Sequence, residues 1–176
     1  MLAAVFGWMG LAAGPTAYAQ NGNGNGDGTA TASIAVSAVV TATTDSEVSM
    51  ITLRDMNIDA QVTRQGMVEV NPLLDAQAGQ MRAEGRPNAT VRISFLQQRE
   101  LTRIGGPETL LFVYNISGNN LDDQASSEIL ELDNREFQLN DEGEFYFWIG
   151  GQVDIRNAVQ GAYDGEFTIE IEYLET

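Results

Sequence analysis

The stretch "GAYDGEFTIEIEYLET", residues Gly161–Thr176, indicates the fold class of this chain. From Glu166 to Tyr173, apolar residues alternate strictly with threonine and glutamate. A period of two places one kind of side chain on each face of a β-strand, so the stretch predicts a closing strand with one apolar and one acidic face. The residues that we expect to face a core are Tyr163, Phe167, Ile169, Ile171 and Tyr173.

The acidic face of this closing strand disfavours casual pairing between sheet edges. If the protein leaves one sheet edge open, we expect that edge beside the closing strand. Its partner would then be the N-terminal segment of the same chain or of a neighbouring copy.

The rest of the chain consists of short apolar or alternating segments separated by turn signals such as Gly105-Gly106-Pro107 and Asp141-Glu142-Gly143. Strands at this spacing favour an all-β sandwich. The apolar phase slips once within residues 48–58, as it does at a β-bulge. Helix evidence is confined to "LLDAQAGQMRAEG" (73–85) and to "DDQASSEILELDNRE" (122–136), whose "EILEL" reads equally well as a strand.

The first 43 residues read as three consecutive segments. Residues 1–19 are an apolar run ending in Ala17-Tyr18-Ala19, whose two alanines are the small residues that a signal peptidase requires. We predict a signal peptide rather than a membrane anchor, because the run is short and no charged stop follows it. Residues 20–31 are rich in Asn and Gly, which predicts a flexible tail. Residues 32–43 alternate as an N-terminal strand, and residues 44–176 form the predicted β-sandwich domain.

The composition excludes several functions. The 176 residues contain no cysteine and no histidine, which removes thiol nucleophiles, histidine bases and ordinary zinc sites. With 25 acidic and 9 basic residues the formal charge is −16, which repels nucleic acids. Some pair of carboxylates is inevitable in so acidic a chain, so such a pair carries no signal for a glycosidase. We therefore expect no enzymatic activity.

Two features offer alternatives to a purely structural role. Oxygen ligands for calcium crowd "NNLDDQ" (119–124) and "LNDEGE" (139–144), but neither has the spacing of an EF-hand loop, so we favour solvated acidic loops and expect no cofactor. The aromatic run in "EFYFWIG" (144–150) could line a sugar-binding platform. Its continuous apolar pattern fits better a central strand that is covered on both faces.

Two stretches resemble a bacterial secreted family known as domain of unknown function 4402. One is "IGGQVDIRNAVQGAYDGEFTIEIEY" (149–173), with the family's Gly-Gly strand and a Gly-x-Tyr-x-Gly turn that falls on Gly161, Tyr163 and Gly165. The other begins "ITLRDMNIDAQ" (51–61) and continues through "GMVEVNP" (66–72) to "AGQMRAEGRPNATVRISF" (78–95), with Asn57-Ile58 in place of the family's Phe-Gly. The resemblance implies an immunoglobulin-like Greek-key sandwich, related to fimbrial and spore-coat-type subunits outside the cell, and no catalytic residues.

These observations predict an exported, extracellular or cell-surface subunit of a filament or pilus that assembles into a homopolymer by β-strand addition. The predicted donor-strand positions are Ile34, Val36, Ala38 and Val40. Backbone ladder bonds would supply affinity, and alternate side chains would fill pockets. The other reading of this segment is the first strand of its own domain. The alternative function is a monomeric extracellular binding module for carbohydrate or adhesion, with calcium as a stabilising ion. We expect neither a nucleic-acid partner nor a membrane span in the mature chain.

Overall fold

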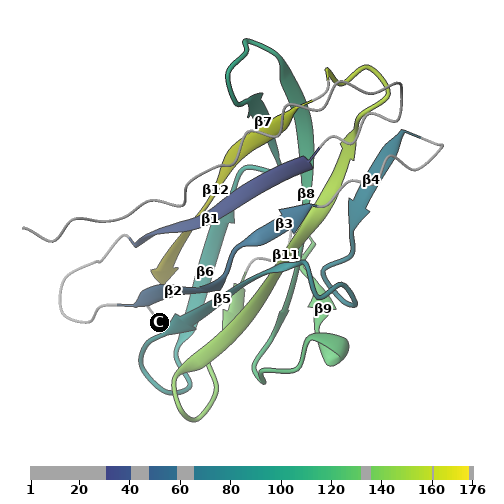
Figure 1. Ribbon diagram of the computed structural model, residues 1–176. Helices are drawn as coiled ribbons and strands as arrows, with labels where there is room; N and C mark the ends of the chain where they lie inside the picture. Colours follow the sequence, from purple (N-terminus) through teal and green to yellow (C-terminus); the bar gives the residue numbers. More distant parts are fainter. Residues whose placement is uncertain (1–30, 41–47, 59–65, 132–135, 160, 175–176) are drawn as a thin grey trace, which may run out of the picture.

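The computed structural model describes the backbone of residues 31–40 and residues 48–58, 66–131, 136–159 and 161–174 in full. These residues form a predominantly antiparallel all-β structure with a single turn of 3₁₀-helix (Figure 1). The predicted fold class is therefore confirmed at the level of an all-β, sandwich-like protein. Among the described residues, no helix is long and apolar enough to span a membrane.

Twelve strands and the 3₁₀-helix follow one another along the described chain. Their bounds are β1 Thr31–Val40, β2 Ser49–Arg54, β3 Met56–Ile58, β4 Met67–Val70, β5 Gly79–Glu84, β6 Thr90–Phe95, β7 Gln98–Arg103, β8 Thr109–Asn119, η1 Gln124–Ser126, β9 Glu128–Ile129, β10 Glu136–Gln138, β11 Glu144–Asp154 and β12 Ala162–Tyr173.

The strands form a circuit that is closed by ladders and by one chain connection, between β2 and β3. The ladder runs from β12 through β7, β8, β11 and β5 to β2. The chain then passes from β2 to β3 through Asp55 alone, and β3 pairs with β1, which pairs with β12 again. Strand β1 is thus the element that closes the circuit, and it lies beside β12 in Figure 1.

The core lies between β12 and the β8–β11 pair. The ring centroids of Tyr114 on β8 and Phe167 on β12 are 4.6 Å apart, although these two strands are not ladder neighbours. Phe112 packs edge-on against Tyr114 at 4.7 Å. The two facing layers therefore meet through interlocked aromatic rings, which remove large apolar areas from water.

Both faces of β11 are covered. Phe147 and Ile149 are fully buried on the core face, and Trp148 is only 1 % exposed on the opposite face. The ladder partners of Trp148 hold loops over it. Ser117 Oγ donates to the carbonyl of Pro72 at 3.2 Å, and Gln80 Nε2 donates to Asp122 Oδ1 at 2.7 Å. Trp148 is thus buried by segments that cross the outside of the sheet.

Gly150 explains how one of these segments can come so close. A Cβ atom at this position would lie 2.3 Å from the Val70 carbonyl oxygen and 2.8 Å from Pro72 Cδ. The Val70 oxygen belongs to the backbone, as does Pro72 N, which would also lie 2.8 Å away. A side chain at Gly150 would therefore displace the whole segment. The first glycine of the Gly-Gly pair therefore serves close packing on the outer face of β11.

Neither of the two helix candidates forms an α-helix over its described residues. Residues Gly79–Glu84 form β5, which pairs with β11 on one side and β2 on the other, so two ladders outweigh the weak helical pattern. In the second region only Gln124–Ser126 is helical, with the Asp123 carboxylate accepting from the Ala125 N–H at 3.2 Å as an N-cap. The strand reading holds for Glu128–Ile129. The predicted phase slip is confirmed as a register shift between Thr52 and Arg54.

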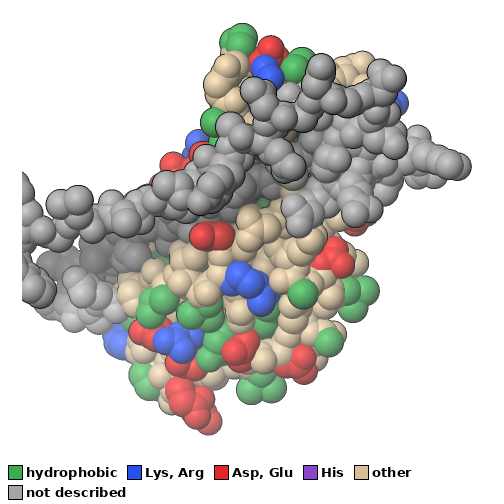
Figure 2. Space-filling model, viewed as in Figure 1, with side chains coloured by type: hydrophobic (Ala, Val, Ile, Leu, Met, Phe, Trp, Pro, Cys, Tyr) green, Lys and Arg blue, Asp and Glu red, His purple; other side chains and the backbone are tan. Residues whose placement is uncertain are grey.

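The described surface mixes both signs of charge. On the face shown in Figure 2, acidic, basic and apolar side chains are interspersed. Arg92 pairs with Glu136 at 2.7 Å and with Glu172 at 3.7 Å, and Arg103 pairs with Glu108 at 3.1 Å. Such exposed pairs contribute little to stability. They leave the large negative net charge of the chain uncompensated.

Candidate strand-addition site

The candidate site is the edge of β12 that faces β1. On its other edge β12 pairs with β7 at Tyr163 and Asp164 and with β6 from Ile169 to Tyr173. On this edge the whole length from Ala162 to Ile171 pairs with β1. This β1–β12 ladder is the parallel pair among the described strand pairs, and all the others are antiparallel.

Strand β3 forms the other wall of the site. Ala32, Ser33 and Ile34 of β1 pair antiparallel with Ile58, Asn57 and Met56. Within the described residues β3 has no other ladder partner. Removing β1 would therefore leave unpaired edges on both β12 and β3, and an open edge of this kind is a template for another strand.

The register places the predicted donor-strand residues opposite the core-facing positions of β12. The Cα partners are Ile34 with Gly165, Val36 with Phe167, Ala38 with Ile169, and Val40 with Ile171. In parallel strands, paired positions lie on the same face of the sheet. These four positions therefore belong to the core side of β1.

The predicted core residues of β12 fall into two groups. Tyr163, Phe167, Ile169 and Ile171 are at most 1 % exposed. Tyr173 is half-buried at the end of the molecule, where its hydroxyl accepts the Arg86 backbone N–H at 2.8 Å and its ring carries the Arg86 guanidinium at 4.4 Å. Tyr173 therefore covers the end of the layers instead of filling their interior.

The Gly-x-Tyr-x-Gly turn orients the start of β12. The hydroxyl of Tyr163 donates to the Val159 carbonyl at 2.8 Å, four residues upstream, and so it ties the incoming loop to the strand. Tyr163 is 1 % exposed, so both its ring and its hydroxyl are covered by the protein. Gly161 has φ +155°. Gly165 leaves room for Leu101, since a Cβ at Gly165 would lie 2.4 Å from Leu101 Cδ2.

Two buried tyrosine hydroxyls provide a matched test of the core. Tyr163→Phe removes a made hydrogen bond and should lower the free energy of unfolding by about 1 kcal/mol. The Tyr114 hydroxyl is buried with no hydrogen-bond partner among the described residues, so Tyr114→Phe should be neutral or raise that free energy by up to about 1 kcal/mol. Urea denaturation of the two variants checks the opposite signs. Equal losses in both would contradict this assignment of the hydroxyls.

Tyr114 also gives a test at alkaline pH. Burial raises the pKa of Tyr114 to about 12, whereas an exposed tyrosine ionises near pH 10. Between these values the unfolded chain has released a proton that the folded chain still holds. The free energy of unfolding of the wild type should therefore fall from about pH 10 to 12, and Tyr114→Phe should fall less steeply.

The aromatic run on β11 does not form a platform for sugars. Phe145 and Tyr146 are each 8 % exposed, and Phe147 and Trp148 are buried more deeply. The reading as a central covered strand is the correct one. The rings lie under loops on one side of the sheet and in the core on the other, so little of any of them is exposed to solvent.

The two loops considered for calcium use their oxygens in turns. Asn140 Oδ1 accepts the backbone N–H groups of Glu142 and Glu144 at 3.0 and 2.7 Å, and Asp123 accepts from η1 and from Ser126 Oγ. Over the described ranges, no three acidic side chains gather as a metal site would require.

Several predictions fall on parts of the chain that the structure does not describe. These are the signal peptide over 1–19, residues 20–30 of the tail, and residues 41–43 of the N-terminal strand. The described part of that strand, Thr31–Val40, begins one residue earlier than predicted.

Neither a protein-family model nor a curated protein sequence matches this chain. The likeness to the secreted family rests on the Gly-Gly and Gly-x-Tyr-x-Gly motifs and stays a prediction.

Sequence reasoning missed three parts of the site. It did not find β3 as the second wall, the limited extent of the β1–β3 ladder, or the parallel sense of β1. The sequence signal available for β3 was the alternation of Met56, Asn57 and Ile58. The structure buries Met56 and Ile58 and exposes Asn57. No local signal specifies the direction of a strand beside its partner.

Proposed function

We propose that this protein is an exported structural subunit of a cell-surface filament or pilus, which assembles by β-strand addition between copies. The observation that carries the proposal is the position of β1. An N-terminal strand completes two otherwise unpaired edges, those of β12 and β3, and seven residues join it to the rest of the domain at Val48. A strand attached in this way can pair with the same two edges, those of β12 and β3, in a neighbouring copy.

The strength of such an assembly would come from backbone hydrogen bonds. The ladder pairs ten residues of β1 with β12 and three with β3. The core-side positions on β1 carry apolar or small residues, which suits insertion between two edges. No metal, cofactor or catalytic group enters this proposal, and we assign the protein no enzymatic activity.

The proposal includes an immunoglobulin-like Greek-key arrangement of the strands. Two observations support it. Strands β2 and β3 follow each other through one residue but pair with different neighbours, as strands do when they cross between layers. Tyr163, near the start of β12, bonds back to the carbonyl of Val159, which is the arrangement of a tyrosine corner.

Electron microscopy of the native cell surface and of the purified protein tests the proposal. We expect filaments from the wild type, and loss of filaments in Val36→Asp, because the charge would stand opposite Phe167 on the core side of the site. Ser37→Asp is the matched control, since its partner Thr168 lies on the other face of β12, and it should keep the filaments. A wild type that forms none under any salt condition would refute the proposal.

A further inference from the structure

The direction of β1 determines which assembly a strand exchange can produce. Val40 lies opposite Ile171, and β2 begins at Ser49, opposite Glu84. These two positions lie at the same end of the molecule, because Tyr173 contacts the Gly85–Arg86 turn there. Thr31 lies at the other end, opposite Ala162. A ten-residue strand separates the two ends by roughly 30 Å.

The connection from β1 to the domain is short. Val48 is 1 % exposed and is therefore held in the core. Seven residues separate Val48 from Val40. Eight Cα steps span at most roughly 28 Å. If β1 is taken up by a second copy, the donor's Val48 must therefore lie within that distance of the position that Val40 occupies in the acceptor.

In the observed parallel sense, the Val40 position of the acceptor is at its Tyr173 end. In the donor, Val48 also lies at the Tyr173 end. The two copies must therefore meet through their Tyr173 ends. The second copy can then return its β1 to the first, and the exchange closes with two-fold symmetry. Uptake in the antiparallel sense would place Val40 at the acceptor's Ala162 end. The Tyr173 end of the donor would then meet the Ala162 end of the acceptor. Repetition of this contact from copy to copy would give an open fibre.

The parallel sense is the one that the structure shows. In the observed register Ile34 stands opposite Gly165 and Ala38 opposite Ile169. Reversal about the Val36–Phe167 pair would set Ile34 opposite Ile169 and Ala38 opposite Gly165, so both positions would change their partners.

Part of strand β1 is paired on one side only. Its ladder with β3 ends at Ile34, so within the described residues positions 35–40 pair with β12 alone. β1 is also the parallel member of an otherwise antiparallel set of described strand pairs, and parallel pairing is slightly weaker per residue. Over positions 35–40, exchange of β1 therefore opens one ladder instead of two.

We infer that a second copy of this chain is the partner for β1 in the sense observed here, and that this exchange forms a closed, reciprocal dimer. Filament growth requires the opposite, antiparallel sense. The inference rests on the strand exchange of the proposed function. It states that the direction of β1 in the acceptor decides whether the product is a closed dimer or a filament. The dimer repeats the contacts of the monomer, so its formation depends on chain concentration and on the connection between Val40 and Val48.

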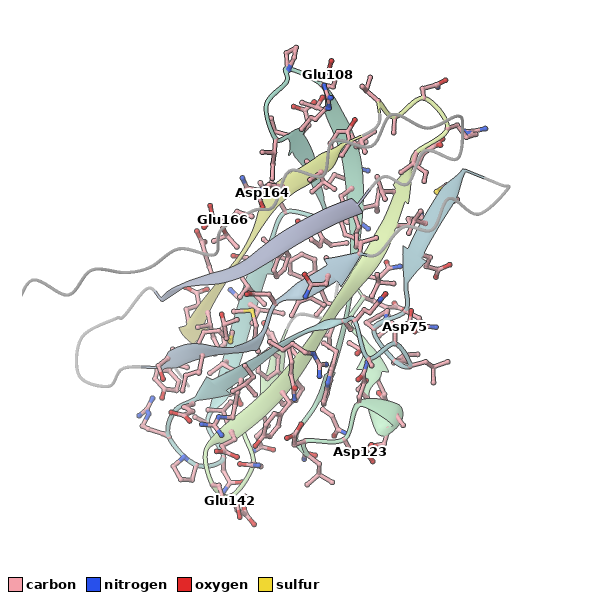
Figure 3. All side chains as sticks on the ribbon, in the orientation of Figure 1. Asp75, Glu108, Asp123, Glu142, Asp164 and Glu166 are labelled. Atoms are coloured by element: carbon pink, nitrogen blue, oxygen red, sulfur yellow. The ribbon has the colours of Figure 1, made fainter. Side chains whose placement is uncertain are left out.

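Two cysteine pairs report the two directions, in a chain whose sequence has no cysteine of its own. Ser33→Cys with Asp164→Cys joins Cα partners of the observed parallel register. Asp164 is exposed and labelled in Figure 3. Ser33→Cys with Glu170→Cys joins the partners of the reversed register. In the observed structure these two positions are six residues out of register, roughly 20 Å apart, which is too far for a disulfide.

The full chain with each pair is refolded from denaturant at low and high concentration, in molar salt to screen the net charge of −16, then oxidised and separated on a denaturing gel without reductant. We expect the parallel pair to give monomer at low concentration and a discrete disulfide-linked dimer whose share rises with concentration. A ladder beyond the dimer with the parallel pair, or monomer alone at every concentration, would overturn the inference.

Isolated filaments separate this result from the proposed function. We expect the antiparallel pair to link their subunits into a ladder and the parallel pair to link none. If the closed dimer forms and filaments never do, the filament proposal fails while the inference stands. If filaments form and the parallel pair links them, the filament proposal stands and the inference fails.

Discussion

Deletion of residues 31–40 should abolish the cooperative unfolding of this protein. Strand β1 pairs with ten residues of β12 and three of β3, so its removal opens the circuit of strands on two sides. Ten paired positions correspond to on the order of ten backbone hydrogen bonds, each worth about 1 kcal/mol net. That sum is comparable to the whole stability of a typical domain, about 5–15 kcal/mol.

The loss should be recoverable in trans. A synthetic peptide of residues 31–40 should restore a cooperative thermal transition to the truncated chain, followed by the fluorescence of Trp148 in a chain that begins at Gln20 and so lacks Trp8. The Val36→Asp peptide is the matched control and should not restore it. If the truncated chain unfolds cooperatively without any peptide, β1 is not an integral strand, and strand addition loses its basis.

Gly151→Ala is the single substitution from which we expect the largest loss. Gly151 has φ +148°, and a Cβ atom there would lie 2.2 Å from the Val113 carbonyl oxygen and 2.5 Å from a ring carbon of Phe112. The change therefore combines an unfavourable backbone conformation with crowding in the aromatic core. Together these should lower the free energy of unfolding by about 2–4 kcal/mol, measured by urea denaturation.

Gly105→Ala separates the two contributions. Gly105 also has positive φ, +84°, but no atom lies within 4 Å of the position of its Cβ. This variant should lose only the conformational part, about 1 kcal/mol. A loss at Gly151 no greater than that at Gly105 would show that the core beside Phe112 accommodates the methyl group.

The Gly-Gly pair could be noticed in the sequence as a motif. The contacts that need glycine at these two positions could not be read from the sequence. Gly150 allows the segment at Val70 and Pro72 to cross outside β11, and Gly151 makes room for the Phe112 ring on the inside. These neighbours lie about 40 to 80 residues away along the chain. A pattern local to residues 149–153 contains no information on what approaches them.

The strands themselves were largely predictable. Alternation marked the core-facing residues Phe167, Ile169 and Ile171, and the apolar run marked a covered β11. The helix candidate over 73–85 does not form, because two flanking ladders stabilise β5 more than its sequence favours a helix. Tyr173 departed from the pattern because it stands at the end of the strand, where the layers stop and Arg86 takes over the contact.

The sequence by itself determined which faces of these strands are apolar, since side-chain alternation is a property of consecutive residues. Only the tertiary structure decided that β1 lies between β12 and β3, that it runs parallel to β12, and that loops bury Trp148. Backbone donors and acceptors are the same in every strand, so a sequence can mark a strand without specifying its neighbour or its direction. Those are set by packing between residues that are distant in the chain, such as Ile34 opposite Gly165.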